Sequence, residues 1–358
     1  MMIENRFPSS GLSAEYGDII ISNVTHEVIL SVSHADTVIL SEKYTPDSSE
    51  NIIIKNIGEL ALLYYEPGEM LTATGEDSNE ILFLISIDCD AEQETISKYV
   101  HIYPTYVDFS STLNVELLKK IPLSRTTKKN TAPGRKEFIS FWGGSTVKIY
   151  AMYMGEIVDQ SITLNLVTLA SNEKTYAVDV SPSVIADLIN QPVSKLIYYN
   201  VYTSEDSIIQ FVVSKRNWQF EKTFMFRNCF GAQETFTCTG DEISQRKWIR
   251  EYGVFNSEKI DFSREMENAI DINSGYITAK DVEVIEDMLN SDDVCVIDGS
   301  GLQKVTILEE EFKDSSRKDE LKSVTFKYRY SKANKLKSTY NSFKKIRVFA
   351  KTFDKKFH

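Results

Sequence analysis

Histidine is the side chain most often used for metal binding and proton transfer near neutral pH, and this chain of 358 residues has four. His26 and His34 lie beside the first predicted strands, His101 lies in a later strand, and His358 is the last residue. None of them has a second histidine at the HxH or HxxxH spacing of a metal site. We therefore expect ordinary surface or core histidines, with no metal and no other cofactor.

An acidic run at residues 88–94 is the strongest candidate for a cation site. In an extended chain, alternation would place Asp88, Asp90, Glu92 and Glu94 on one side, where their oxygens could bind Ca²⁺. The run lacks the glycine and the terminal glutamate of an EF-hand loop. We expect a solvated acidic turn.

Motifs for nucleophilic catalysis and phosphate binding are missing from the sequence. Residues 298–302 (Asp-Gly-Ser-Gly-Leu) lack the lysine and the helix start of a phosphate loop, and residues 141–145 (Phe-Trp-Gly-Gly-Ser) lack the GxSxG elbow. With 52 acidic residues, no carboxylate pair can be singled out for glycosidase chemistry. We expect a protein that is not an enzyme and has no small-molecule substrate, with a hydrolase as the least favoured alternative.

The four cysteines are scattered and form no CxxC pair, so the sequence has neither a zinc knuckle nor a redox motif. Cys229 and Cys238 flank a predicted hairpin and could approach each other. Reduced thiols are nevertheless expected in a cytoplasm. The cysteines are Cys89, Cys229, Cys238 and Cys295.

The overall charge disfavours nucleic-acid binding by the globular part. The chain has 40 Lys+Arg against 52 Asp+Glu, a net charge of −12 and a pI near 5.0. The first residues do not form a secretory signal, and the longest apolar run, residues 81–85, is far shorter than the ~20 residues that span a bilayer. We expect a protein assembled in a cytoplasm, without a membrane span.

Alternating β-branched segments predict a mainly β fold with an α+β C-terminal part. We expect an N-terminal β-sandwich with a short helix at residues 1–120, a basic linker or exposed loop at 121–136, and a second β-sandwich-like module at 137–221. An α+β module with a hairpin and a capped helix at 222–330 and a basic amphipathic arm at 331–358 complete the chain.

Three short helices are predicted from caps and apolar stripes. Asn56 caps the first, Ser181 caps the second with Pro182 at its first position, and a capping box at residues 278–281 opens the third. The stripes predicted to be buried are Ile57, Leu60, Leu63 and Tyr64; Val184, Ile185, Leu188 and Ile189; and Val282, Ile285, Met288 and Leu289.

The C-terminal arm has nine Lys/Arg and one acidic residue, and its aromatic residues fall near helical spacing. Such a segment can dock on an acidic protein, a membrane surface or nucleic acid, and the sequence leaves these open. We expect an assembly arm whose main residues are Phe343, Lys344, Lys345, Arg347, Phe349, Phe353 and Phe357.

The third module resembles a family of virion neck and tail structural proteins from tailed phages that infect Bacteroidetes, including crAss-like phages. The resemblance covers about residues 220–330. It is carried by residues 226–240, an aromatic strand, an Asn-x-x-Gly loop and an aromatic-Thr strand ending in Gly, and by stretches at 272–278, 289–294 and 304–307.

This resemblance implies a ring, collar, hub or adaptor subunit of a virion, whose partners are copies of itself and other neck or tail proteins. An acidic body with a basic arm suits head-to-tail contact between copies. The alternative is a carbohydrate- or host-surface-binding β-sandwich protein, for which a line of exposed rings would be needed. Trp142, Trp218 and Trp248 are the candidates for that line.

Overall fold

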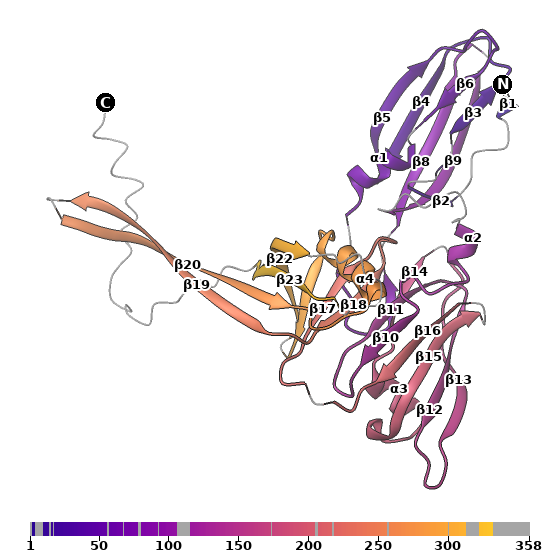
Figure 1. Cartoon of the computed structure of the whole chain (residues 1–358). Coiled ribbons are helices and arrows are strands. Elements are labelled where there is room, and N and C mark those ends of the chain that lie inside the picture. The colour runs from indigo at the N-terminus through magenta and orange to yellow at the C-terminus, as the bar shows by residue number, and fades with distance from the viewer. Residues whose placement is uncertain are drawn as a thin grey trace.

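The computed structural model of the chain is drawn in Figure 1. It describes residues 2–3 and 10–331, with gaps at 14–15, 17, 56, 67, 78–79, 92, 106–114, 173, 205–206, 217, 256–257, 300 and 313–321. The fold is mainly β with a small α+β part, which confirms the predicted fold class. None of the helices in these residues is long and apolar enough to cross a membrane.

The N-terminal sandwich packs a three-stranded sheet on a five-stranded sheet. β8 buries every second side chain from Ile81 to Cys89, because alternate residues of a strand point to opposite faces. The first sheet has the order β1 (Met2–Ile3), β3 (Ile19–Ser22), β6 (Ile52–Ile54); the second has the order β2 (Ser10–Leu12), β9 (Glu94–Tyr103), β8 (Ile81–Cys89), β4 (Val28–His34), β5 (Thr37–Tyr44).

Helix α1 (Ile57–Tyr64) forms where expected, but its predicted stripe is wrong at Leu63 and Tyr64, which are 79% and 37% exposed. The helix instead buries Ile57, Gly58 and Ala61. A Cβ at Gly58 would lie 2.1 Å from the Ser13 carbonyl oxygen, so the helix packs through its small residues. The predicted cap, Asn56, lies outside the described residues.

The middle sandwich also has two sheets, with helix α3 (Pro182–Leu188) packed on its core through Ile185. Pro182 is at the predicted first position, whereas Leu188, predicted to be buried, is 38% exposed. The sheet orders are β10 (Lys128–Thr131), β16 (Ser207–Val213), β15 (Leu196–Ser204), β12 (Thr146–Tyr153), β13 (Gln160–Thr168), and β11 (Phe138–Trp142), β14 (Thr175–Asp179), β7 (Gly75–Asp77). The short helices are α2 (Val115–Leu118) and η1 (Val193–Lys195).

Two of these strands lie in segments that were not predicted to belong to the middle sandwich. β7 follows the first helix and pairs antiparallel with β14. β10 lies inside the basic stretch 121–136, which we expected to be an exposed loop, and pairs in parallel with β16. Leu123, Lys129 and Arg135 in this stretch are buried, because its basic side chains meet carboxylates from distant parts of the chain.

The C-terminal module is a seven-stranded sheet with helix α4 (Ala279–Leu289) packed on it. The predicted capping box is confirmed: Thr278 Oγ1 accepts a bond from the Asp281 N–H, and Asp281 Oδ2 accepts one from the Thr278 N–H at 2.9 Å. The sheet order is β18 (Gln233–Cys238), β17 (Lys222–Arg227), β21 (Val294–Asp298), β22 (Gly301–Phe312), β23 (Val324–Tyr330), β20 (Glu258–Asn273), β19 (Glu242–Phe255).

Candidate functional site

The reactive residue types singled out from the sequence do not converge in the described part of the chain. His101 Nδ1 lies 3.0 Å from Glu80 Oε2, and His34 Nδ1 lies 3.1 Å from the Leu82 carbonyl oxygen. In the acidic run, Asp88 accepts a hydrogen bond from Thr95. No group of three His, Cys, Asp or Glu side chains placed to hold a metal ion occurs among the described residues.

The hairpin predicted around residues 229–233 is confirmed and forms the centre of the molecule. β17 and β18 pair from Lys222 opposite Cys238 to Arg227 opposite Gln233. In the loop, Asn228 Oδ1 accepts the N–H groups of Phe230 and Ala232 at 3.1 and 3.2 Å. We call the region where this loop meets the two sandwiches the junction.

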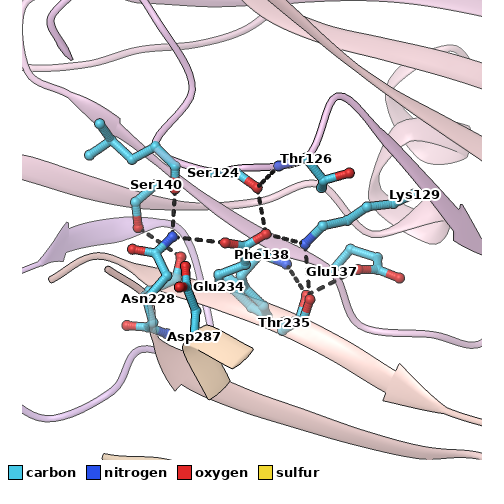
Figure 2. Close-up of polar contacts among 12 residues, drawn as sticks. Ser124, Thr126, Lys129, Glu137, Phe138, Ser140, Asn228, Glu234, Thr235 and Asp287 are labelled. Carbon is cyan, nitrogen blue, oxygen red and sulfur yellow. Dashed lines mark hydrogen bonds and ion pairs between the residues drawn. The ribbon is translucent and has the colours of Figure 1, made fainter. Parts of the chain in front are cut away.

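A buried carboxylate organises the polar side of the junction (Figure 2). Glu234, 1% exposed, lies 2.5 Å from the Lys129 ammonium. It also accepts hydrogen bonds from Ser124 at 2.6 Å and from the Asn228 amide at 2.8 Å. A buried ion needs such a full set of partners, since each unmatched polar atom carries its desolvation penalty. Strand β10 is therefore held against β18.

A second buried ion pair ties the hairpin to β7, and further hydrogen bonds tie it to the segment between α1 and β7. Arg227 Nη1 lies 2.8 Å from Asp77 Oδ1, and the two side chains are 4% and 0% exposed. Arg227 also donates to the carbonyl oxygens of Gly68 at 2.8 Å and Gly231 at 3.3 Å. Burial raises the pKa of Asp77, and the neighbouring Arg227 opposes that rise.

Side-chain amide and apolar contacts close the junction. The Gln233 amide pairs with the backbone of Leu71, donating to its carbonyl oxygen at 2.6 Å and accepting its N–H at 3.0 Å. The rings of Tyr103 and Trp142 lie 4.2 Å apart. The shared apolar cluster consists of Leu12, Tyr103, Leu118, Leu123, Trp142, Cys229, Phe230 and Ala232. All three units therefore share one small core.

The junction continues into a 560 Å³ cleft beside α4. Asp287 in this cleft lies 3.0 Å from Arg125 and accepts the Cys229 N–H at 3.3 Å. Burial, followed by the charge of Asp287, raises the pKa of the Cys229 thiol. A thiol with a raised pKa is a poor nucleophile at neutral pH, so this cluster is suited to joining α4 to the hairpin.

The most prominent feature of the surface, a two-stranded extension of the C-terminal sheet, was not predicted from the sequence. β19 and β20 pair from Glu242 opposite Ile272 to Phe255 opposite Glu258, whereas β20 pairs with β23 only over residues 270–273. Residues 246–255 and 258–268 therefore extend beyond the sheet as a two-stranded ribbon (Figure 1). Trp248 and Tyr252 on the ribbon are 56% and 55% exposed, and Ile243, in β19 beside the sheet, is 61% exposed. The signal that could have found it is the alternation of apolar residues along 260–272.

The remaining sequence candidates are dispersed. The residues of the expected arm, 332–358, lie outside the described residues. Trp142 is buried in the junction, Trp218 is half-buried with Arg216 4.4 Å from its ring centre, and Trp248 lies on the ribbon. These tryptophans do not share one sheet face. All four cysteines are buried and free, and Cys229 and Cys238 are not paired.

Comparison with known protein families finds no match, and comparison with curated proteins finds no sequence similar to this chain.

Proposed function

We propose that this protein is a structural subunit of a larger assembly and acts through protein–protein contacts. The ribbon formed by residues 246–255 and 258–268 carries this proposal. A two-stranded ribbon without a sheet or core behind it is marginally stable in water. Its outer strand β19 has no hydrogen-bonded strand on its free side within the described residues, and unpaired strand edges readily add a further strand.

The distribution of charge supports contact between copies. Residues 10–103 contain seventeen Asp+Glu and three Lys+Arg, whereas residues 331–358 contain nine Lys+Arg and one acidic residue. The basic segment of one copy would be attracted to the acidic N-terminal sandwich of the next, which is a head-to-tail contact. A head-to-tail contact gives a closed ring when the rotations between successive copies add up to one full turn.

The assembly that we propose is the neck or tail of a phage virion, as a ring, collar, hub or adaptor. The resemblance supports this assignment, and the junction gives its main motif a physical role. The Asn-x-x-Gly loop is the segment whose side chains and backbone join the three units. A virion subunit of this kind works by holding its neighbours at a fixed angle.

Shortening the ribbon tests the proposal. Residues 246–268 are replaced by Asn-Gly, which closes the hairpin after the pair Gln245–Ala269 and keeps the pairs next to the sheet. We expect light scattering after gel filtration to show oligomers of the full chain and monomers of the shortened chain, with the same melting temperature for the body. A full chain that stays monomeric at its highest soluble concentration contradicts the proposal.

Substitution variants separate loss of contact from loss of folding. Ile243→Ser, Trp248→Ser and Tyr252→Ser together should weaken assembly, whereas Val38→Ser and Leu63→Ser, at exposed apolar positions of the N-terminal sandwich, should not. Removal of residues 332–358 should weaken assembly most at low salt, because salt screens exposed charges. Mass spectrometry of purified particles, which should contain the chain in stoichiometric copy number, tests the virion assignment.

A further inference from the structure

The outer face of the five-stranded sheet in the middle sandwich is open and carries three tyrosines. Its inner face packs on the core, where the Tyr199 and Phe211 rings stack 4.9 Å apart. On the outer face, Tyr150 of β12 and Tyr198 and Tyr202 of β15 are half-buried and do not belong to the core. These rings therefore sit on two neighbouring inner strands of the sheet, β12 and β15.

The strand register places the rings next to one another. Tyr150 is opposite Asn200, the residue midway between Tyr198 and Tyr202. The ring centres of Tyr150 and Tyr198 are 6.2 Å apart, with 37° between their planes. Tyr198 and Tyr202 are four residues apart, about 13 Å along a strand. The three tyrosines thus share one face within about 13 Å of strand length.

Amide and hydroxyl groups surround these rings. Asn200 and Gln210 lie opposite each other on β15 and β16, and the Gln210 amide donates to Asn200 Oδ1 at 3.4 Å. On the other side, β13 places Thr163 opposite Tyr150 and Asn165 opposite Lys148. These groups can both donate and accept hydrogen bonds, as sugar hydroxyls do.

The face has no carboxylate, although the protein carries 52. The outward positions of its five strands hold no Asp or Glu, and the described residues Glu156 and Asp159 lie in the connection between β12 and β13. Lys128 and Lys148 supply exposed positive charge at outward positions. The face is therefore locally positive although the protein has a net charge of −12, and this local charge matches an anionic partner.

We propose that this face binds an extended acidic polysaccharide. Tyrosine rings offer flat, amphipathic surfaces that lose little conformational entropy on binding, and the C–H faces of pyranose rings stack on such surfaces. The amides and hydroxyls bond the sugar hydroxyls, and the lysines match the acid groups of the chain. This site is separate from the ribbon, so a subunit held in an assembly through its ribbon would keep the face free.

An array of purified microbial polysaccharides, with acidic and neutral chains in separate arms, tests the proposal on the full chain. We expect binding to acidic chains that weakens with salt. Tyr150→Ala with Tyr198→Ala should weaken it by about tenfold or more, the effect of losing roughly 1.4 kcal/mol of contact. Tyr99→Ala, at a 62% exposed position of the N-terminal sandwich, is the matched control and should bind as the parent does.

A second variant keeps every ring in place. Thr163→Glu puts a carboxylate on an exposed position of the face and should abolish binding by repulsion without disturbing the core. Circular dichroism and the melting temperature verify the fold of each variant. Three results would overturn the proposal. They are binding to no polysaccharide of the array, binding to neutral chains alone, and binding that stays unchanged in the tyrosine and Thr163 variants. None of these results depends on the oligomeric state, so this proposal and the assembly proposal fail independently.

Discussion

Arg227→Met tests whether the junction holds the three units together. The arginine makes a 2.8 Å ion pair with Asp77 and donates to two carbonyl oxygens, those of Gly68 and Gly231. Methionine fills much of the same volume but leaves the Asp77 carboxylate buried and unpaired. Breaking a buried pair from one side lowers the free energy of unfolding by about 3–5 kcal/mol. We expect a loss of that size.

The loss should depend on pH in a defined direction. The pKa of folded Asp77 is already above its ordinary value of 3.8, because burial raises it more than Arg227 lowers it. Removing Arg227 raises that pKa further, so folding then favours the protonated carboxyl more strongly. The stability that comes from this raised pKa is fully present at pH values below the pKa of Asp77 in the unfolded chain. It is lost as the pH rises through the pKa of Asp77 in the folded protein. The loss in Arg227→Met should therefore be smaller at pH 4 than at pH 7.

Urea titration followed by tryptophan fluorescence is the appropriate assay, because Trp142 lies in the junction. Adding Asp77→Asn to Arg227→Met removes the orphaned charge and should recover part of the loss. Lys43→Met is the control: it breaks the Lys43–Glu27 pair, whose side chains are 62% and 48% exposed, and should change stability by less than about 1 kcal/mol. A loss below 1 kcal/mol in Arg227→Met, or a double variant no more stable than the single, would refute the reasoning.

Three further outcomes are expected. Gly231→Ala should lower the melting temperature, because φ is +67° at this residue and the new Cβ would lie 2.7 Å from the Pro104 carbonyl oxygen. The backbone conformation alone disfavours alanine by about 1–2 kcal/mol. Burial raises the pKa of Glu137 above its ordinary value of 4.5. In urea titrations the parent should therefore lose stability relative to Glu137→Gln as the pH rises above that value. Stability profiles that stay parallel over this pH range would contradict this. Ellman's reagent should detect four thiols in denaturant without reductant and almost none in the folded protein at pH 8. The reason is that the cysteines are buried and that burial raises the pKa of Cys229, Cys238 and Cys295. Detection of two thiols in denaturant would indicate a disulfide.

The elements that could be predicted from the sequence are those with a local physical signal. β8 has Ile, Phe or Cys at every second position from Ile81 to Cys89, because one of its faces is core. The α4 capping box and the proline at the first position of α3 mark helix starts within a few residues. The β17–β18 hairpin combines two alternating runs with a glycine at positive φ.

The elements that were missed depend on contacts between distant residues. The basic stretch 121–136 has the composition of an exposed loop, and only the approach of Glu234, more than one hundred residues later, explains a buried Lys129. β7 is three residues long, too short for its pattern to reveal a partner in another sandwich. The ribbon extends beyond the sheet, so its alternating residues could not be assigned to a core or to a partner strand from the sequence.

The same distant contacts determine how the ribbon and the tyrosine face are held relative to each other. β17 is joined to β20 through β21, β22 and β23 of one sheet, and β18 contacts β11 of the middle sandwich, where the Phe138 N–H donates to Thr235 Oγ1 at 3.0 Å. Two surfaces connected through hydrogen-bonded strands and a buried ionic core cannot rotate independently without breaking that core. The junction therefore fixes the angle between the ribbon and the outer face of the middle sandwich. The junction also joins the N-terminal sandwich to the module that carries the ribbon, through the shared apolar cluster. In the proposed head-to-tail assembly, the angle between those two parts sets the curvature, since closure depends on the rotation between successive copies. Changes at the junction that leave the chain folded would then act on ring geometry, whereas changes on the ribbon would act on affinity.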